Sequence, residues 1–301
     1  MKSTNTANSV INRVLAKRPA PGKLQAAATA PTLESKRSTG KRSKQESILD
    51  IPDVSELKAM IKALMTPAKP AQPDAPIQTL VAVTLDESGS MSHGFKQTMK
   101  GYNDQMKVLR KTAKQIGCRV MQTTFNSSAK IITEDVTADF IVPLSTETYD
   151  PSGGTALYDT VAAVVSRLLA HPLAHQDNTS ILLMLTTDGE DTSSVKWNAS
   201  KKLTEFRALM KAVSKNDRWS VSLAGPDRML RQFSDELSVD AENVASFVPT
   251  DIKSRSDAMQ SSVHAMNSYA ALRSMGTKKV STMHAGTVSG QRAKEILKPK
   301  P

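Results

Sequence analysis

The chain has 301 residues, a formal net charge of +11 and only 4% aromatic residues. Its single cysteine, Cys118, excludes an intrachain disulfide framework. No apolar run approaches the roughly 18 residues of a membrane-spanning helix, and residues 1–15 do not resemble a signal peptide. We therefore expect a cytoplasmic protein that does not enter a membrane.

The positive charge is unevenly distributed. Residues 1–45 carry a net charge of +9 and residues 276–301 a net charge of +5, whereas residues 46–275 carry −3. Residues 1–45 also lack a sustained hydrophobic period, so we expect disordered basic tails at 1–45 and 276–301. Such tails could bind nucleic acid through its phosphates, bind an acidic protein, or serve only as soluble arms.

Residues 46–76 form a separate piece in this interpretation. Apolar side chains recur at helical spacing and predict a short amphipathic helix over about 55–65, with Ser55 as a plausible N-cap. Prolines at regular intervals then predict a stiff linker, and they are Pro67, Pro70, Pro73 and Pro76. The helix could dock in a partner's groove or pack on the chain's own domain.

Residues 77–275 alternate strand and helix patterns. Strands are predicted at 77–85, 118–125, 130–133, 179–187, 219–224 and 244–248, and helices at about 95–116, 155–170, 197–214, 226–237 and 251–274. Residues 80–85 and 181–185 are nearly continuous apolar runs, typical of strands covered on both faces. Asn126-Ser127-Ser128 predicts a hairpin and hence one antiparallel edge strand. The pattern favours a doubly wound, mostly parallel α/β sheet.

Small oxygen-bearing side chains follow the ends of these strands. Asp86 directly follows one buried run and Asp188 another, and the carboxyl ends of parallel strands share one edge of a sheet. Ser88 and Ser90 alternate with Asp86, and Thr155 follows two glycines at a helix start. Two carboxylates and three hydroxyls are hard ligands that suit Mg²⁺ or Mn²⁺. An ion so held would keep an attraction for one more anionic oxygen, such as a partner's Asp or Glu.

The order Asp-x-Ser-x-Ser, then Thr, then Asp resembles the metal-ion-dependent adhesion site of von Willebrand factor type A domains. The strings YDPSGGTALYD at 149–159 and LTTDGED at 185–191 look like the bacterial intracellular branch of that family. The resemblance covers 77–275. It implies a six-stranded, Rossmann-like sheet with the metal at its upper edge, where the hydroxyls touch the ion and the aspartates often act through water. It also implies an adaptor or assembly role, in some relatives beside a ring-shaped ATPase.

Two enzymatic interpretations of the same residues fail. An aspartate nucleophile for phosphoryl transfer generally needs a second acid two residues on, where Ser88 stands. A serine hydrolase elbow needs a glycine two residues before and two residues after the serine, but Asp86 and Ser90 flank Ser88 in this way, and Ser88 and Ser92 flank Ser90. We therefore predict a non-enzymatic protein-interaction module. A protein that binds nucleic acid through its tails, or a structural component of a larger particle, are the alternatives.

Further acidic residues and the histidines have open roles. Glu87, Glu190 and Asp191 could deepen a negative well around a metal, or could form a solvated loop face. The five histidines show no paired metal-ligand spacing near a third ligand, so we expect ordinary surface residues.

Overall fold

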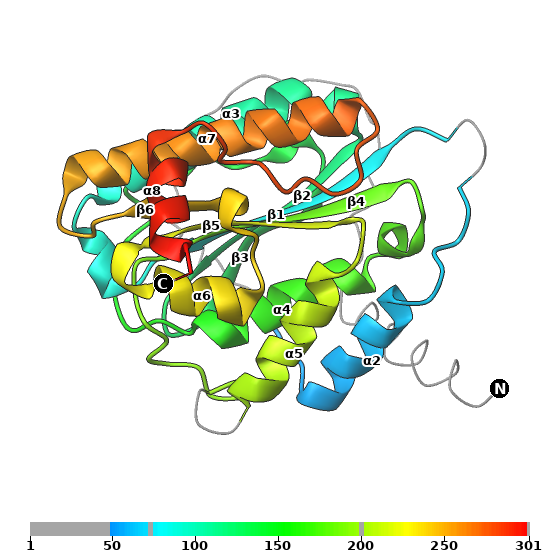
Figure 1. The fold of residues 1–301 in the computed structure, drawn as a ribbon, viewed down its shortest axis with the longest axis horizontal. Helices are drawn as coiled ribbons and strands as arrows, with labels where there is room; N and C mark the ends of the chain where they lie inside the picture. The colour runs from blue at the N-terminus through cyan, green and yellow to red at the C-terminus, as the bar shows by residue number, and fades with distance from the viewer. Residues whose placement is uncertain (1–48, 72–74, 199–201, 300–301) are drawn as a thin grey trace, which may run out of the picture.

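A computed structural model describes residues 49–71, 75–198 and 202–299. Within these ranges the chain forms one six-stranded sheet with helices on both faces (Figure 1). The strand order is β3-β2-β1-β4-β5-β6. The basic segment predicted at 1–45 lies outside the described residues.

All strand pairs are parallel except the pair of β2 with β3, which the turn at 126–128 joins as a hairpin. The doubly wound α/β sheet with one antiparallel edge strand is therefore confirmed. The strands are β1 (Gln78–Asp86), β2 (Cys118–Phe125), β3 (Ala129–Val136), β4 (Thr179–Thr186), β5 (Trp219–Pro226) and β6 (Val244–Phe247).

The helices divide into two layers, with α3 and α7 on one face of the sheet and α2, α4, α5 and α6 on the other (Figure 1). An additional helix, α8, packs against the edge strand β6 and against α7. The helices are α2 (Val54–Leu64), α3 (Phe95–Ile116), α4 (Leu157–Ala170), α5 (Leu203–Ser214), α6 (Leu230–Leu237), α7 (Ile252–Ser274) and α8 (Val288–Leu297). Short 3₁₀ turns are η1 (Gly89–Ser92), η2 (Ala138–Phe140), η3 (Pro172–His175), η4 (Asp227–Met229) and η5 (Ala241–Asn243).

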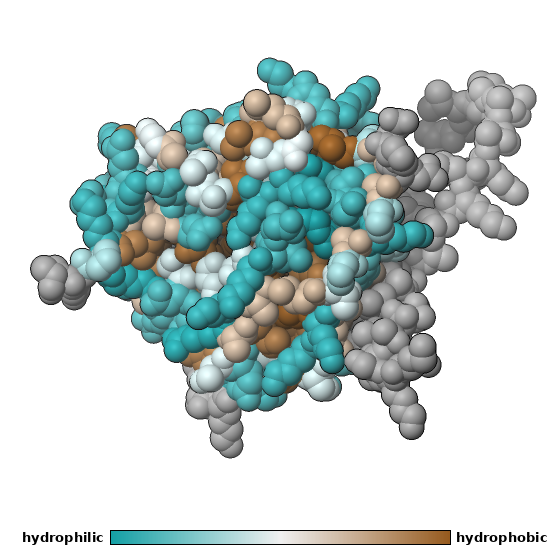
Figure 2. Space-filling model, turned by 45° about the vertical axis from the view of Figure 1, so that its right-hand side comes forward, coloured by the Kyte–Doolittle hydropathy of each residue, from teal (hydrophilic) through white to brown (hydrophobic). Residues whose placement is uncertain are grey.

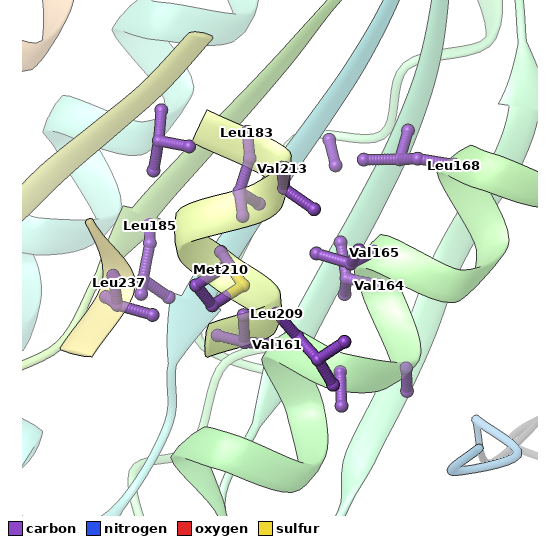
Figure 3. Close-up of a cluster of buried hydrophobic side chains, with 14 of the residues drawn as sticks. Val161, Val164, Val165, Leu168, Leu183, Leu185, Leu209, Met210, Val213 and Leu237 are labelled. Atoms are coloured by element: carbon purple, nitrogen blue, oxygen red, sulfur yellow. The ribbon is translucent and has the colours of Figure 1, made fainter. Parts of the chain in front are cut away.

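The central strands are buried on both faces, as their apolar runs predict. In β1, Leu80 and Ala82 belong to the core under α4 and α5, whereas Val81 and Val83 belong to the core under α3 and α7. Figure 3 shows the first core, where side chains of α4, α5 and α6 meet those of β4. Strands β1 and β4 pair in parallel at the centre of the sheet, so their carboxyl ends lie together.

Two predicted helix starts are wrong by several residues. Residues 226–237 do not begin as a helix, because Pro226 still pairs with Phe247 in the sheet and η4 precedes α6. Helix α5 begins at Leu203 instead of near 197. Trp197 lies buried in the preceding loop, where its backbone N–H donates to the Asp159 carboxylate at 2.7 Å.

Helix α2 packs on the domain itself. Four apolar side chains on one face are buried in the core under α4 and α5, namely Leu57, Met60, Ile61 and Leu64. The N-cap is Asp53 and not Ser55. The Asp53 carboxylate accepts from the N–H of Glu56 at 2.8 Å, and the Glu56 carboxylate accepts from the N–H of Asp53 at 3.1 Å. This reciprocal capping box satisfies two backbone donors, which Ser55 does not do.

The expectation of a disordered tail at 276–301 is wrong for its described part. Val280, Met283 and Ala293 are buried, and α8 begins at a Thr287 N-cap. The basic side chains of α8 find acidic partners on the domain, with Arg292 paired to Asp227 and Lys294 to Glu242 at 2.7 Å. Net charge along the sequence could not show that the folded domain supplies these partners.

On the face seen in Figure 2, hydrophobic residues form small separate groups among hydrophilic ones. Large side chains with high exposure are scattered among loops and helix ends across the described residues, and include Phe140, Val195, Ile252, Met275 and Val288. None of the described helices is both long and apolar enough to cross a membrane.

Candidate metal site

The ends of β1 and β4 bring the first two predicted ligands to one edge of the sheet. Leu85 of β1 pairs with Thr186 of β4, so Asp86, the last residue of β1, lies near Thr187 and Asp188, which follow β4. Asp86 is fully buried. One oxygen of its carboxylate accepts from the backbone N–H of Ser88 at 2.7 Å, and the other accepts from the hydroxyl of Thr187 at 2.6 Å. These two bonds fix the carboxylate between the strands.

A chain of polar contacts joins the two serines to the second aspartate. The Oγ atoms of Ser88 and Ser90 lie 3.1 Å apart, and the Ser90 hydroxyl donates to Oδ1 of Asp188 at 2.5 Å. Ser88 and Asp188 are buried, whereas Ser90 is exposed. Turn η1 begins at Gly89, between the two serines. The group is therefore accessible to solvent on the side of Ser90.

Thr155 reaches the same place from the loop before α4. A Cβ built on Gly189 would lie 3.2 Å from Oγ1 of Thr155 and 3.3 Å from Oγ of Ser90. The backbone of Thr155 is fixed by the 192–193 loop, whose two N–H groups donate to its carbonyl at 2.8 and 3.0 Å. The structure thus gathers Asp86, Ser88, Ser90, Thr155 and Asp188 at the carboxyl edge of the sheet. The space beside Gly189 is lined by two hydroxyls that a side chain there would crowd.

Backbone bonds hold the three loops of this site together. Gly89 donates to the carbonyl of Gly153 at 3.1 Å, which links the Asp86 loop to the Thr155 loop. The Tyr149 hydroxyl donates to the carbonyl of Asp86 at 2.8 Å. Glu87 is 2% exposed, and its Oε1 accepts from the N–H of Asp150 at 2.8 Å. The solvated interpretation of Glu87 is therefore wrong, because this carboxylate positions the loop that carries Thr155.

The other two extra acids behave differently. Glu190 is exposed, as the solvated loop interpretation expects. Asp191 is half-buried, and its Oδ1 accepts from the Ser194 hydroxyl at 2.5 Å, within the loop that follows β4. Burial raises the pKa of Asp191, in opposition to that hydrogen bond.

Burial also dominates the electrostatics of the first aspartate. The pKa of Asp86 is raised to about 6, chiefly by burial and to a smaller extent by the nearby charge of Asp188, in opposition to the hydrogen bonds from Thr187 and Ser88. A carboxylate whose charge is disfavoured by burial and by a like charge gains from a nearby cation. The two buried aspartates therefore create a demand for positive charge.

Arg255, which the sequence motif did not include, compensates part of this negative charge. Nη2 of Arg255 donates to Oδ2 of Asp188 at 2.7 Å, and both side chains are almost fully buried, with 1% and 0% exposure. Arg255 lies in the first turn of α7, far from the motif in the chain. One sequence signal could have found it. Arg255, Ala258 and Met259 have helical spacing and form one buried face, so a charged residue stands where an apolar one is expected.

The donor set fits a hard divalent ion in its chemistry. Two carboxylates and three hydroxyls converge here, and this set suits Mg²⁺ or Mn²⁺ better than Zn²⁺. Among the described residues no group of three or more His, Cys, Asp or Glu side chains could hold a metal. A metal here would therefore depend on the hydroxyls as well as on the acids.

The predicted histidines and cysteine have other surroundings. His284 is fully buried and His171 is 9% exposed, so the surface expectation is wrong for both. His284 lies between Ser222 and Ser261, while His171 Nε2 lies 2.9 Å from the Asp135 carboxylate. Cys118 is a buried free thiol whose pKa burial raises to about 12, so it is an unreactive core residue.

The sequence matches no protein-family model, and no curated protein matches it. Among solved structures, a von Willebrand factor type A protein from Catenulispora acidiphila is similar at 15% identity and a TM-score of 0.42, over 64% of this chain and 43% of that one. The PilB minor pilin from Streptococcus sanguinis is similar at 12% identity and a TM-score of 0.45, over 68% and 63% of the two chains. The pilus adhesin SpaC from Lactobacillus rhamnosus GG is similar at 13% identity and a TM-score of 0.46, over 70% and 31%. The matches span less than two thirds of the length of each of these proteins, and all three likenesses are distant.

Proposed function

We propose that this chain is a non-enzymatic protein-interaction module that captures an acidic side chain of a partner through a divalent metal ion. Asp86, Ser88, Ser90, Thr155 and Asp188 would hold the ion, which is Mg²⁺ or Mn²⁺ in this proposal. The observation that carries the proposal is the joint position of Ser90 and Thr155, whose hydroxyl oxygens both flank the space beside Gly189, next to Asp188.

The charge of the site supports capture of an anion. The two buried aspartates are already partly compensated, because Arg255 pairs with Asp188. A divalent ion added to one guanidinium and two carboxylates leaves an excess of positive charge. When bound, the ion would supply a Lewis-acidic position for a carboxylate oxygen. The exposed side of Ser90 is the direction from which a partner could approach.

The side chains around the two aspartates position their carboxylates, as a binding site requires. The side chains that hydrogen-bond to the carboxylates of Asp86 and Asp188 include those of Thr187, Ser88, Ser90 and Arg255. None of these side chains is a general base at neutral pH. The same residues do suffice to orient the carboxylates and to hold the site rigid.

Calorimetric titration with Mn²⁺ tests the proposal. The wild-type chain is expected to bind one ion, and Asp86→Asn is expected to weaken binding at least tenfold, because the amide keeps the shape of the carboxylate but removes its charge. Asp104→Asn is the matched control, since Asp104 is a surface residue of α3 paired with Lys100 and Lys107. Equal Mn²⁺ binding by wild type and Asp86→Asn would overturn the proposal.

Water-proton relaxation tests whether the bound ion keeps an open position. Mn²⁺ that retains exchangeable water enhances the relaxation of bulk water, whereas an ion ligated entirely by protein does not. The proposal expects strong enhancement that falls when acetate is added as a carboxylate probe. An enhancement that acetate leaves unchanged would contradict capture of an acidic side chain.

A further inference from the structure

Arg255 occupies a pocket built by several separate parts of the chain. Its guanidinium carbon lies 4.8 Å from the centre of the Phe247 ring of β6, and Nη1 lies 3.3 Å from the sulfur of Met91 in η1. Gly94 has a φ of 78°, and a Cβ built there would lie only 2.8 Å from Cδ of Arg255. The absence of a side chain at Gly94 therefore makes room for this arginine.

The partners of the guanidinium do not balance its charge without Asp188. Besides the ion pair, Nη2 lies 3.3 Å from the carbonyl of Pro249, and Nε is buried without a hydrogen-bond partner among the described residues. A buried cation with few acceptors depends strongly on its counter-ion. Asp188 is that counter-ion, and it is also a residue of the proposed metal site.

We propose that Arg255 is a resident cation of the metal site, which shares Asp188 with the divalent ion and thereby weakens the binding of that ion. This inference rests on the proposed function. Arg255 donates to Oδ2 of Asp188, while Ser90 donates to Oδ1 of the same carboxylate. Arg255 repels a second cation there and withdraws part of the charge of Asp188. The ion is therefore held loosely and keeps more of its attraction for a partner's carboxylate.

The sign of one substitution separates this role from a merely structural one. A residue that only orients a metal ligand makes binding weaker when it is removed, by about 10- to 100-fold. A competing cation makes binding tighter when it is removed. We therefore expect Arg255→Met to bind Mn²⁺ at least tenfold more tightly than wild type, whereas Arg255→Lys keeps the charge and stays close to wild type.

Arg273 provides a matched control. It is also a buried arginine of α7, with 1% exposure, and its guanidinium donates to backbone carbonyls, including that of Gln78 at 2.9 Å. The two arginines are about 27 Å apart along the helix. Arg273→Met should leave the Mn²⁺ affinity unchanged even where it lowers stability.

Calorimetric Mn²⁺ titration of these variants, with Asp86→Asn alongside, gives distinguishable results. If Asp86→Asn loses binding but Arg255→Met binds no more tightly than wild type, the metal site stands and the resident-cation role is overturned. If wild type and Asp86→Asn bind Mn²⁺ equally, both proposals fall.

If Arg255→Met does not fold, an NMR titration of the wild type with Mg²⁺ tests the proposal instead. The Nε–H NMR signal of Arg255 should then shift while that of Arg273 does not, and an unmoved Arg255 signal at saturation overturns the proposal.

Discussion

The two ends of α7 hold buried arginines in contrasting ways. At the far end, Arg273 donates to the carbonyls of Gln78 and Asn178, which are neutral groups. At the near end, Arg255 is paired with the charged Asp188, which is also a residue of the proposed metal site. Arg273 satisfies backbone carbonyls, and we expect its hydrogen bonds to stay unchanged when an ion is added. Arg255 is paired with a carboxylate of the proposed metal site, so its charge balance would change if an ion bound there.

The largest expected effect distinguishes the two arginines by how much of the stability lost on substitution Mn²⁺ restores. Without metal, Arg255→Met leaves Asp188 buried and uncompensated and should lower the free energy of unfolding by about 3 kcal/mol or more. Arg273→Met leaves carbonyls without donors and should cost a similar amount. Mn²⁺ at 100 times its dissociation constant should then restore about 2.7 kcal/mol to Arg255→Met.

Urea unfolding with and without Mn²⁺ checks this contrast. In Arg273→Met, Mn²⁺ should add no more stability than it adds to wild type at the same concentration. An equal gain in unfolding free energy on adding Mn²⁺ to the two variants would contradict this difference, because the stabilisation by the ion would then not depend on the charge of Asp188.

The middle of α7 gives a pH-dependent test. The ring of His284 lies between Ser222, with Oγ 2.8 Å from Nε2, and Ser261 of α7, with Oγ 2.7 Å from Nδ1. Burial lowers the pKa of His284 to about 3 from an ordinary value of 6.5. As pH falls below 6.5, the unfolded chain binds this proton and the folded chain does not. Stability is therefore fully present above the ordinary pKa and falls toward pH 3, by up to about 1.4 kcal/mol per pH unit.

Comparison of wild type with His284→Gln isolates this effect. Other groups that titrate in this range, such as His175, whose pKa burial also lowers, are present in both proteins and cancel. We expect the difference in unfolding free energy between the two proteins to shrink from pH 7 to pH 5. A difference that stays constant over this range would contradict the neutral buried histidine.

A smaller effect is expected from the space beside Gly189. In Gly189→Ala the new Cβ would lie 3.2 Å from the Thr155 hydroxyl and 3.3 Å from that of Ser90, so both must move. We expect Mn²⁺ affinity to fall about tenfold, or about 1.4 kcal/mol. Gly225→Ala is the control, since its nearest contact would be an ordinary 3.5 Å. Unchanged affinity in Gly189→Ala would show that these hydroxyls do not hold the ion.

The smallest effect lies far from both arginines, at the start of α2. Asp53→Ala removes the acceptor for the N–H of Glu56 and should lower the free energy of unfolding by about 1 kcal/mol, with no change in Mn²⁺ affinity. Ser55→Ala should cost much less, because its hydroxyl only donates to the Asp53 carboxylate. Equal losses in the two variants, measured by urea unfolding, would contradict Asp53 as the cap.

The sheet and the shared edge of the site were predictable because they depend on local patterns. The apolar runs of β1 and β4 required burial on both faces, and Asp86 and Asp188 had to follow at the carboxyl ends of those strands. The helical spacing around Arg255 could mark it as a buried charge, but its pairing with Asp188 was not predictable, since that depends on how α7 lies across the sheet. The packing of α8 was not predictable either. The buried residues Val280 and Met283, which precede this helix, are too few to form a hydrophobic pattern in the sequence.

A crystal structure with Mn²⁺, read from its anomalous scattering, tests the central claim most directly. We predict one ion among Asp86, Ser88, Ser90, Thr155 and Asp188, with at least one coordination position occupied by water. An absent ion, or an ion whose positions are all filled by this chain, would contradict the account.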